Sequence, residues 1–155
     1  YILHCFECFH RETARGIVPP LKRGCPECHS RLHVAGHLWL GEMWDKKFCA
    51  QMQKEAKERN MRHGEEILRM LSLVTKEAEA PITYYVVDKL CDRWGLPIPS
   101  MSRIVAELRK SGFEAVPTHF NTKAVKTDAS ARVMKKIVTG LVCLRKQENN
   151  LRNAG

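Results

Sequence analysis

Two Cys-x-x-Cys pairs constrain this chain more than any other feature. Cys5 and Cys8 form the first pair, Cys25 and Cys28 form the second, and 16 residues separate them. Such pairs are typical of a zinc site, because two intervening residues let one turn aim both thiolates at the same ion. Four sulfur ligands leave no position for water, so the predicted site is structural and not catalytic. We therefore expect a small four-cysteine module resembling a zinc ribbon over residues 1–44.

Other interpretations of the cysteines stay open at this point. The four could be buried free thiols, or a nearby histidine could replace one of them as a ligand. The neighbouring histidines are His4, His10, His29 and His33. The remaining cysteines, Cys49, Cys91 and Cys143, are expected on helix faces as small hydrophobic residues. Seven cysteines are an odd number, which argues against a disulfide framework and indicates a reducing compartment.

After residue 44 the hydrophobic pattern becomes helical. Apolar spacing predicts helices over 46–59, 65–79, 83–94 and 100–112, with Asp45, Thr83 and Ser100 as N-caps. A hairpin is expected next, with strands at 113–118 and 124–127. A last helix is expected from Ser130 to about Lys146, followed by a frayed polar tail.

This order predicts an α+β protein with three parts. Helix, turn, helix and hairpin is the order of a winged-helix module, so residues 45–127 are expected to form a winged-helix-like domain with the hairpin as its wing. The preceding part is the cysteine module of residues 1–44. The third part, residues 128–155, is a basic C-terminal helix with its tail.

The distribution of charge favours a polyanionic partner. The net charge is +9, and residues 123–155 carry eight basic and two acidic residues. Nucleic acid is the commonest polyanion, although a solvated basic surface is the alternative. The longest nearly uncharged apolar stretch, Ile137 to Leu144, is far shorter than the roughly 20 residues of a membrane span, so no membrane partner is expected.

The beginning of the chain has no secretory signal and no initiator methionine, so we expect a piece of a longer intracellular protein. Motifs for nucleotide binding, metalloprotease or serine hydrolase chemistry do not occur in the sequence.

Several strings after the first cysteine pair occur in a specific order. The most telling are AGHLWLG at 35–41 with Trp44-Asp45, THF at 118–120 and AVKTDA at 124–129. In this order they resemble the C-terminal region of the tRNA guanine-26 N2,N2-dimethyltransferase family, which includes a vertebrate paralogue of the main enzyme. The resemblance runs from about Tyr1 to Val138.

The resemblance implies that the full protein transfers methyl groups from S-adenosylmethionine to a guanine N2 in tRNA. The family's Rossmann-like catalytic domain precedes the region seen here, so this fragment is expected to be non-catalytic and to bind no S-adenosylmethionine itself. The four cysteines would hold Zn²⁺, and the remainder would hold tRNA against the catalytic domain of the same chain. The implied location is the nucleus, with the nucleolus included, or the cytosol.

The candidates for tRNA contact lie in the helix–hairpin unit and the last helix. They are Arg103, Arg109, Lys110, His119, Lys123, Lys126, Thr127, Arg132, Lys135 and Lys136. Because side chains cannot read the deep, narrow major groove of A-form RNA, contacts to phosphates are expected rather than helix insertion. Trp39 and Trp44 are expected to seal the cysteine module against a neighbouring domain, or else to stack on a base.

A second function stays open on spacing alone. A zinc ribbon with a winged helix could dock on protein or duplex DNA without any modification chemistry. A methyltransferase domain upstream of this chain would favour the first function over the second.

Overall fold

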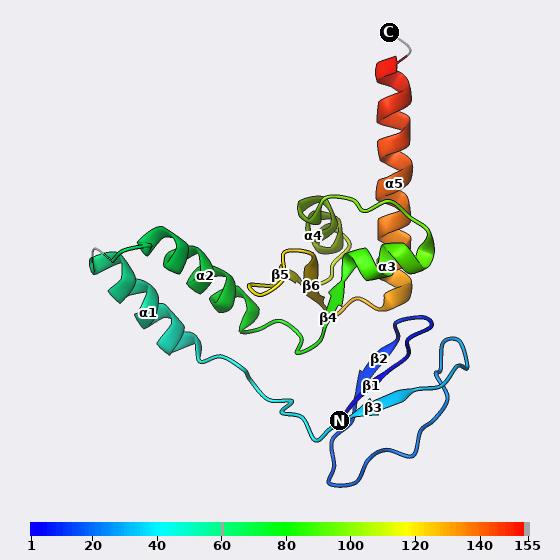
Figure 1. Ribbon diagram of the computed structural model, residues 1–155, viewed down its shortest axis with the longest axis horizontal. Helices are drawn as coiled ribbons and strands as arrows, with labels where there is room; N and C mark the ends of the chain where they lie inside the picture. Colours follow the sequence, from blue (N-terminus) through cyan, green and yellow to red (C-terminus); the bar gives the residue numbers. More distant parts are fainter. Residues whose placement is uncertain (60, 154–155) are drawn as a thin grey trace.

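The computed structural model describes residues 1–59 and 61–153, without side chains at 146 and 148–153. Figure 1 shows two small sheets, a helical hairpin that projects to one side, and a long last helix. In chain order the elements are β1 (Ile2–His4), β2 (Arg11–Thr13), β3 (His33–Ala35), α1 (Lys46–Glu58), α2 (Gly64–Glu77), β4 (Tyr84–Val86), α3 (Val87–Trp94), α4 (Met101–Lys110), β5 (Ala115–Pro117), β6 (Ala124–Thr127) and α5 (Ala131–Asn153). None of the helices in the described ranges is long and apolar enough to cross a membrane.

The cysteine module is built around a three-stranded antiparallel sheet in the order β2-β1-β3. Leu3 and Leu32 are almost completely buried and pack with Cys5 and Cys25 in a small separate core. The sequence gives no sign of β2, whose residues Arg-Glu-Thr show no apolar alternation. Antiparallel pairing with β1 is what makes this segment a strand.

The main hydrophobic core lies between the second sheet, in the order β4-β6-β5, and the helices α3, α4 and α5. Leu90 of α3, Ile104 of α4 and Val125 of β6 are buried there with Met134 and Val138 of α5. The first half of α5 therefore belongs to this core, and Figure 1 shows its second half extending away from it. The predicted helix continues past Lys146 to Asn153, and residues 154–155 lie outside the described residues.

The predicted third helix begins later than its sequence indicated. Tyr84–Val86 forms β4, which pairs with β6, and Thr83 is not a cap because the helix begins only at Val87. Aromatic and β-branched residues fit a pleated strand, and the β5–β6 hairpin supplies the edge for it to join. The periodicity of the segment alone could not show that this edge was available.

The predicted N-caps Asp45 and Ser100 are present in the structure. Asp45 Oδ1 accepts a hydrogen bond of 3.0 Å from the Phe48 backbone, and Ser100 Oγ accepts one of 3.4 Å from Arg103. At the end of α4, Gly112 has φ 84° and Phe113 N donates to Leu108 O at 3.0 Å. This is a Schellman cap, in which glycine adopts the left-handed conformation without strain.

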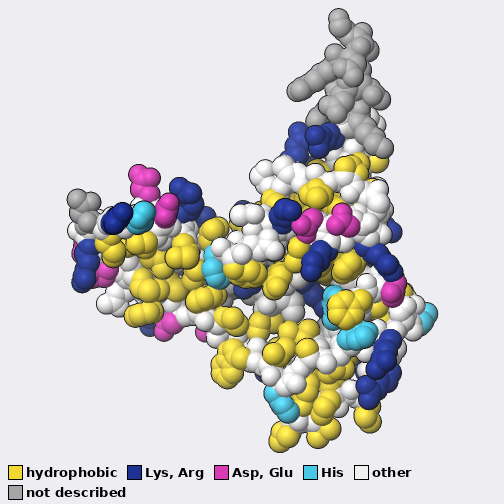
Figure 2. All heavy atoms as spheres, viewed as in Figure 1, with side chains coloured by type: hydrophobic (Ala, Val, Ile, Leu, Met, Phe, Trp, Pro, Cys, Tyr) yellow, Lys and Arg dark blue, Asp and Glu magenta, His cyan; other side chains and the backbone are white. Residues whose placement is uncertain are grey.

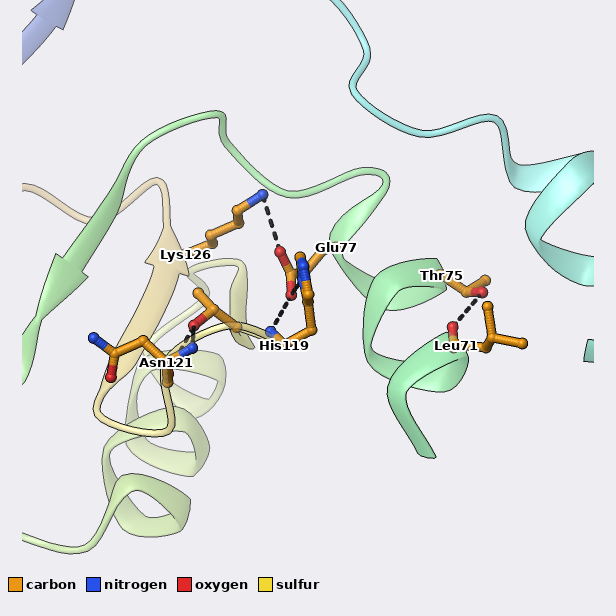
Figure 3. Close-up of polar contacts among 7 residues, drawn as sticks. Leu71, Thr75, Glu77, His119, Asn121 and Lys126 are labelled. Atoms are coloured by element: carbon orange, nitrogen blue, oxygen red, sulfur yellow. Dashed lines mark hydrogen bonds and ion pairs between the residues drawn. The ribbon is translucent and has the colours of Figure 1, made fainter. Parts of the chain in front are cut away.

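The α1–α2 hairpin packs mainly on itself, and the C-terminal end of α2 joins it to the core. Figure 3 shows the buried contact made by Glu77, the last residue of α2. Glu77 Oε1 accepts from the His119 backbone at 2.5 Å and lies 2.9 Å from His119 Nδ1. Glu77 Oε2 lies 3.1 Å from Lys126 Nζ, at an angle too oblique for a hydrogen bond. The network therefore connects α2 to the β5–β6 loop and to strand β6.

Arg11 of β2 fixes the cysteine module on the helical core. Its guanidinium lies 3.5 Å from the centre of the Tyr85 ring and donates to Thr127 O at 3.1 Å. Burial lowers the pKa of Arg11, and the nearby Tyr85 opposes that shift. The two contacts join the first sheet to the second.

Replacing Arg11 with methionine is expected to lower the free energy of unfolding by about 2 kcal/mol, because a desolvated cation–π contact and a charged hydrogen bond are lost together. Chemical denaturation followed by circular dichroism measures this. Arg15→Met is the matched control, since Arg15 follows β2 but is exposed. Equal effects of the two variants would contradict this role of Arg11.

Candidate metal centre and basic surface

The fold brings the four predicted cysteines together in one cluster. Their sulfur atoms all lie within 4.8 Å of one another, with Cys5 Sγ to Cys28 Sγ and Cys8 Sγ to Cys25 Sγ both at 3.5 Å. A tetrahedron with Zn–S bonds of about 2.3 Å places its sulfurs about 3.8 Å apart. The four thiols therefore fit a tetrahedral metal ion and could hold one.

Both cysteine pairs sit on turns of the same construction. Cys5 N donates to His10 O and Cys25 N donates to Ser30 O, each at 2.8 Å. In each turn the residue after the second cysteine, Phe9 or His29, has a positive φ of 61°. These turns aim both thiols of a pair toward the same point.

The cluster is closed and made of sulfur only. No histidine belongs to it among the described residues, so the alternative of a histidine ligand finds no support in the geometry. Burial raises the pKa of the Cys5 and Cys8 thiols, while hydrogen bonds from the Ser30 side chain and backbone lower the pKa of Cys28 to about 6. Four sulfur ligands would leave no place for a reacting water, which suits a structural ion.

Each turn also carries a glutamate that reaches the helical core. Glu7 pairs with Arg93 of α3, and Glu27 pairs with Arg132 of α5 at 2.5 Å. The sequence alone did not predict these pairs. The available signal was the repeated glutamate directly before the second cysteine in both motifs.

Two of the residues predicted to contact tRNA are buried. Lys126 is 5% exposed and pairs with Glu77, while Thr127 is 1% exposed and its Oγ1 accepts from Ala129 N at 3.1 Å. Both lie on β6, in which every residue is buried because β4 and β5 flank the strand. Both side chains are enclosed in this structure, and their contact with tRNA stays a prediction.

Most of the other candidates have partners within the chain. Lys123 lies 3.1 Å from Asp88, and Arg109 Nε donates to Ala115 O at 2.9 Å. Lys110 lies 3.8 Å from Glu107, across one turn of α4. His119 is held by Glu77 and Arg132 by Glu27. Arg103 is exposed on α4 and is not free of partners either.

Lys135 and Lys136 of α5 are exposed, as is Arg145 farther along the same helix. Among the described residues none of the three has an ion-pair partner. Figure 2 shows a group of basic side chains near the end of the described part of α5. The candidate basic surface is therefore centred on α5 and not on the β5–β6 loop.

The two predicted tryptophans occupy different environments. Trp44 is half-buried and its ring lies edge-on to His119, with ring centres 5.5 Å apart. Trp39 is exposed, and its Nε1 donates to Glu42 O at 3.1 Å. Trp44 thus packs the segment between β3 and α1 against the β5–β6 loop. This packing is compatible with the expectation that Trp44 seals the cysteine module against its neighbour.

Residues 1–139 match the family model described as N2,N2-dimethylguanosine tRNA methyltransferase. The chain belongs to this family. A relative from Methanobrevibacter smithii, named tRNA (guanine(26)-N(2))-dimethyltransferase, is 36% identical over 91% of the chain and 36% of its own length. An Aquifex aeolicus relative, named tRNA (guanine(26)-N(2)/guanine(27)-N(2))-dimethyltransferase, is 34% identical over 88% of the chain and 34% of its own length.

The fold also matches a solved family structure. Trm1 from Pyrococcus horikoshii, in complex with S-adenosyl-L-methionine, superposes with a TM-score of 0.72 at 24% identity. The match covers 89% of the chain and 34% of that protein. The chain thus spans about a third of the length of these family members, and the resemblance found in the sequence is confirmed. The relatives named here come from archaea and a bacterium, so they give no support to a nuclear location.

Proposed function

We propose that this chain is the tRNA-holding part of an S-adenosylmethionine-dependent tRNA guanine-N2 methyltransferase. The family match over residues 1–139 carries the proposal, because relatives with that name align along nearly the whole chain. The chain aligns with about a third of each relative, so the remaining part of the protein would bind S-adenosylmethionine and perform methyl transfer. We assign no catalytic residue to this chain.

The proposed fold of the core is a winged helix. The order β4, α3, α4, β5 and β6 supports it, because two helices are followed by a hairpin whose second strand pairs with the strand before the helices. We propose further that the four cysteines hold Zn²⁺. The ion would lock the two turns and so keep Glu7 and Glu27 in place against the helical core.

The proposed tRNA surface follows α5. Lys135, Lys136 and Arg145 are exposed and have no ion-pair partner in the described part of the chain, which suits them to contacts with phosphates. Such contacts position the RNA backbone and do not read its sequence. Lys110 can join them, because its exposed pair with Glu107 is weak.

Binding of folded tRNA, with duplex DNA of equal charge as competitor, tests the proposal across a salt series. We expect a preference for tRNA that persists near physiological salt. Equal binding to both nucleic acids with a steep salt dependence would indicate a basic surface only and would contradict the proposal.

Reversing the charge of Lys135 and Lys136 together to glutamate is expected to weaken tRNA binding at least tenfold, since about two phosphate contacts become repulsive. Filter binding or fluorescence anisotropy measures this. Lys54→Glu with Lys57→Glu is the matched control, because it makes the same change of net charge on α1. Equal losses of tRNA affinity in both double variants would contradict the proposal that α5 is the contact surface.

The alternative of an interaction module without modification chemistry is not favoured. Its fold would be the same, but the relatives that match along the chain are named as tRNA dimethyltransferases.

A further inference from the structure

The first cysteine turn presents an aromatic ring to solvent. Phe6 lies between Cys5 and Cys8 and is 60% exposed, although apolar rings normally gain free energy by burial. Two histidines hold the ring edge-on: the ring centres of His4 and His33 each lie 4.8 Å from that of Phe6, at interplanar angles of 85° and 72°. These two contacts restrict the orientation of the ring, and most of its surface stays open to solvent.

An exposed cation, Arg31, lies two residues before His33, whose ring contacts Phe6. Leu32 is buried, so the flanking residues Arg31 and His33 point to the opposite, exposed face of the segment. Arg31 has no ion-pair partner in the described residues. Figure 2 shows histidine, hydrophobic and basic side chains side by side over the cysteine module. Together Phe6, His4, His33 and Arg31 form what we call the knuckle patch.

The acidic residues near the knuckle patch are already neutralised. Glu7 follows Phe6 directly but pairs with Arg93, and Glu27 of the second turn pairs with Arg132. Arg31, by contrast, has no ion-pair partner in the described residues. An aromatic face next to a positive charge matches a nucleotide, which has a flat base and an anionic phosphate, better than it matches an apolar protein segment.

We propose that the knuckle patch binds an unpaired nucleotide of the RNA, with the base stacked on Phe6 and its phosphate on Arg31. This inference rests on the proposed function and adds a second contact area to the α5 surface. An unpaired base is required, because the faces of paired bases are covered by their neighbours in the helix. The turn and the two histidine rings hold Phe6 in place before binding, so little conformational entropy is lost when a base stacks.

The test compares Phe6→Ala with the wild type in the full protein that contains this chain. The probes are an RNA hairpin with unpaired nucleotides and a fully paired RNA duplex of the same length. We expect about a tenfold loss of affinity for the hairpin, the usual effect of removing one stacking ring, and at most about a twofold loss for the duplex. Phe6→Trp should keep the hairpin affinity, because tryptophan also presents a flat ring.

The chain offers a close control in Phe48, which is 59% exposed on α1. Phe48→Ala should leave the affinity for both probes unchanged. Arg31→Gln should weaken binding to the hairpin and lower the salt slope by about one unit, as expected for one lost phosphate contact. The metal content of each variant, measured in parallel, shows that the cysteine cluster is intact.

Three outcomes would overturn the inference. Unchanged hairpin binding by Phe6→Ala would leave the ring as a contact for protein, whereas equal losses on hairpin and duplex would indicate a general effect. Equal losses of hairpin affinity in Phe6→Ala and Phe48→Ala would likewise indicate a general effect and not a contact specific to Phe6. In all three cases wild-type preference for tRNA over duplex DNA would still uphold the proposed function. If the wild type shows no preference for tRNA over duplex DNA, both the knuckle-patch inference and the proposed function are rejected.

Discussion

Replacing Cys25 with serine is expected to abolish metal binding and to unfold the cysteine module. Cys25 is 1% exposed, and its sulfur lies 3.5 Å from that of Cys8. Binding of a structural zinc ion contributes about 10–16 kcal/mol of apparent free energy, which is also folding free energy when no site exists in the unfolded chain. The small core of this module has few buried apolar side chains to replace that contribution.

Metal analysis and thermal unfolding measure the effect. The wild type should contain one zinc ion per chain, whereas Cys25→Ser should contain none and lose the unfolding transition of residues 1–35. Cys143→Ser is the matched control, since Cys143 is exposed on α5 outside the cluster. A Cys25→Ser protein with full zinc content, or a metal-free wild type with unchanged stability, would exclude the proposed structural ion.

Removing one partner of the buried Glu77–Lys126 pair is expected to have the next largest effect. The Glu77 side chain is 0% exposed and that of Lys126 is 6% exposed, so Lys126→Met leaves the carboxylate of Glu77 buried with only His119 beside it. Breaking such a pair costs about 3–5 kcal/mol. For a chain of this size that corresponds to a fall in Tm of roughly 10 °C. Calorimetry or circular dichroism measures the change.

Two further variants test whether the unpaired buried charge causes the loss of stability in Lys126→Met. Lys123→Met breaks the exposed pair with Asp88 and should cost less than about 1 kcal/mol. Glu77→Leu with Lys126→Met replaces both charges by apolar groups and should recover much of the loss. A double variant as unstable as Lys126→Met would show that packing, and not the unpaired charge, determines the effect.

The same comparison bears on function. If Lys126 acts only within the core, Lys126→Met should change tRNA affinity no more than its loss of stability explains. The double variant should then bind tRNA like the wild type.

The features that the sequence predicted correctly depend on local chemistry. The spacing of Cys5, Cys8, Cys25 and Cys28 predicted a single cluster, because a turn of two residues can aim both thiols at one point. The caps at Asp45 and Ser100 were predictable because each is a contact between a side chain and a backbone amide three residues away.

The features that only the tertiary structure decided depend on pairing between distant segments. Arg11–Thr13 and Tyr84–Val86 became strands because β1 and β6 offered edges to them, and no local pattern indicates such an edge. Residue type suggested that Lys126 lies on the surface, yet its strand is enclosed and Glu77, distant in sequence, neutralises its charge. Sequence by itself thus determined the residues of the cysteine cluster and the helix N-caps at Asp45 and Ser100. The burial of each charge depends on which segment covers it, and that was determined only by the packing of the whole chain.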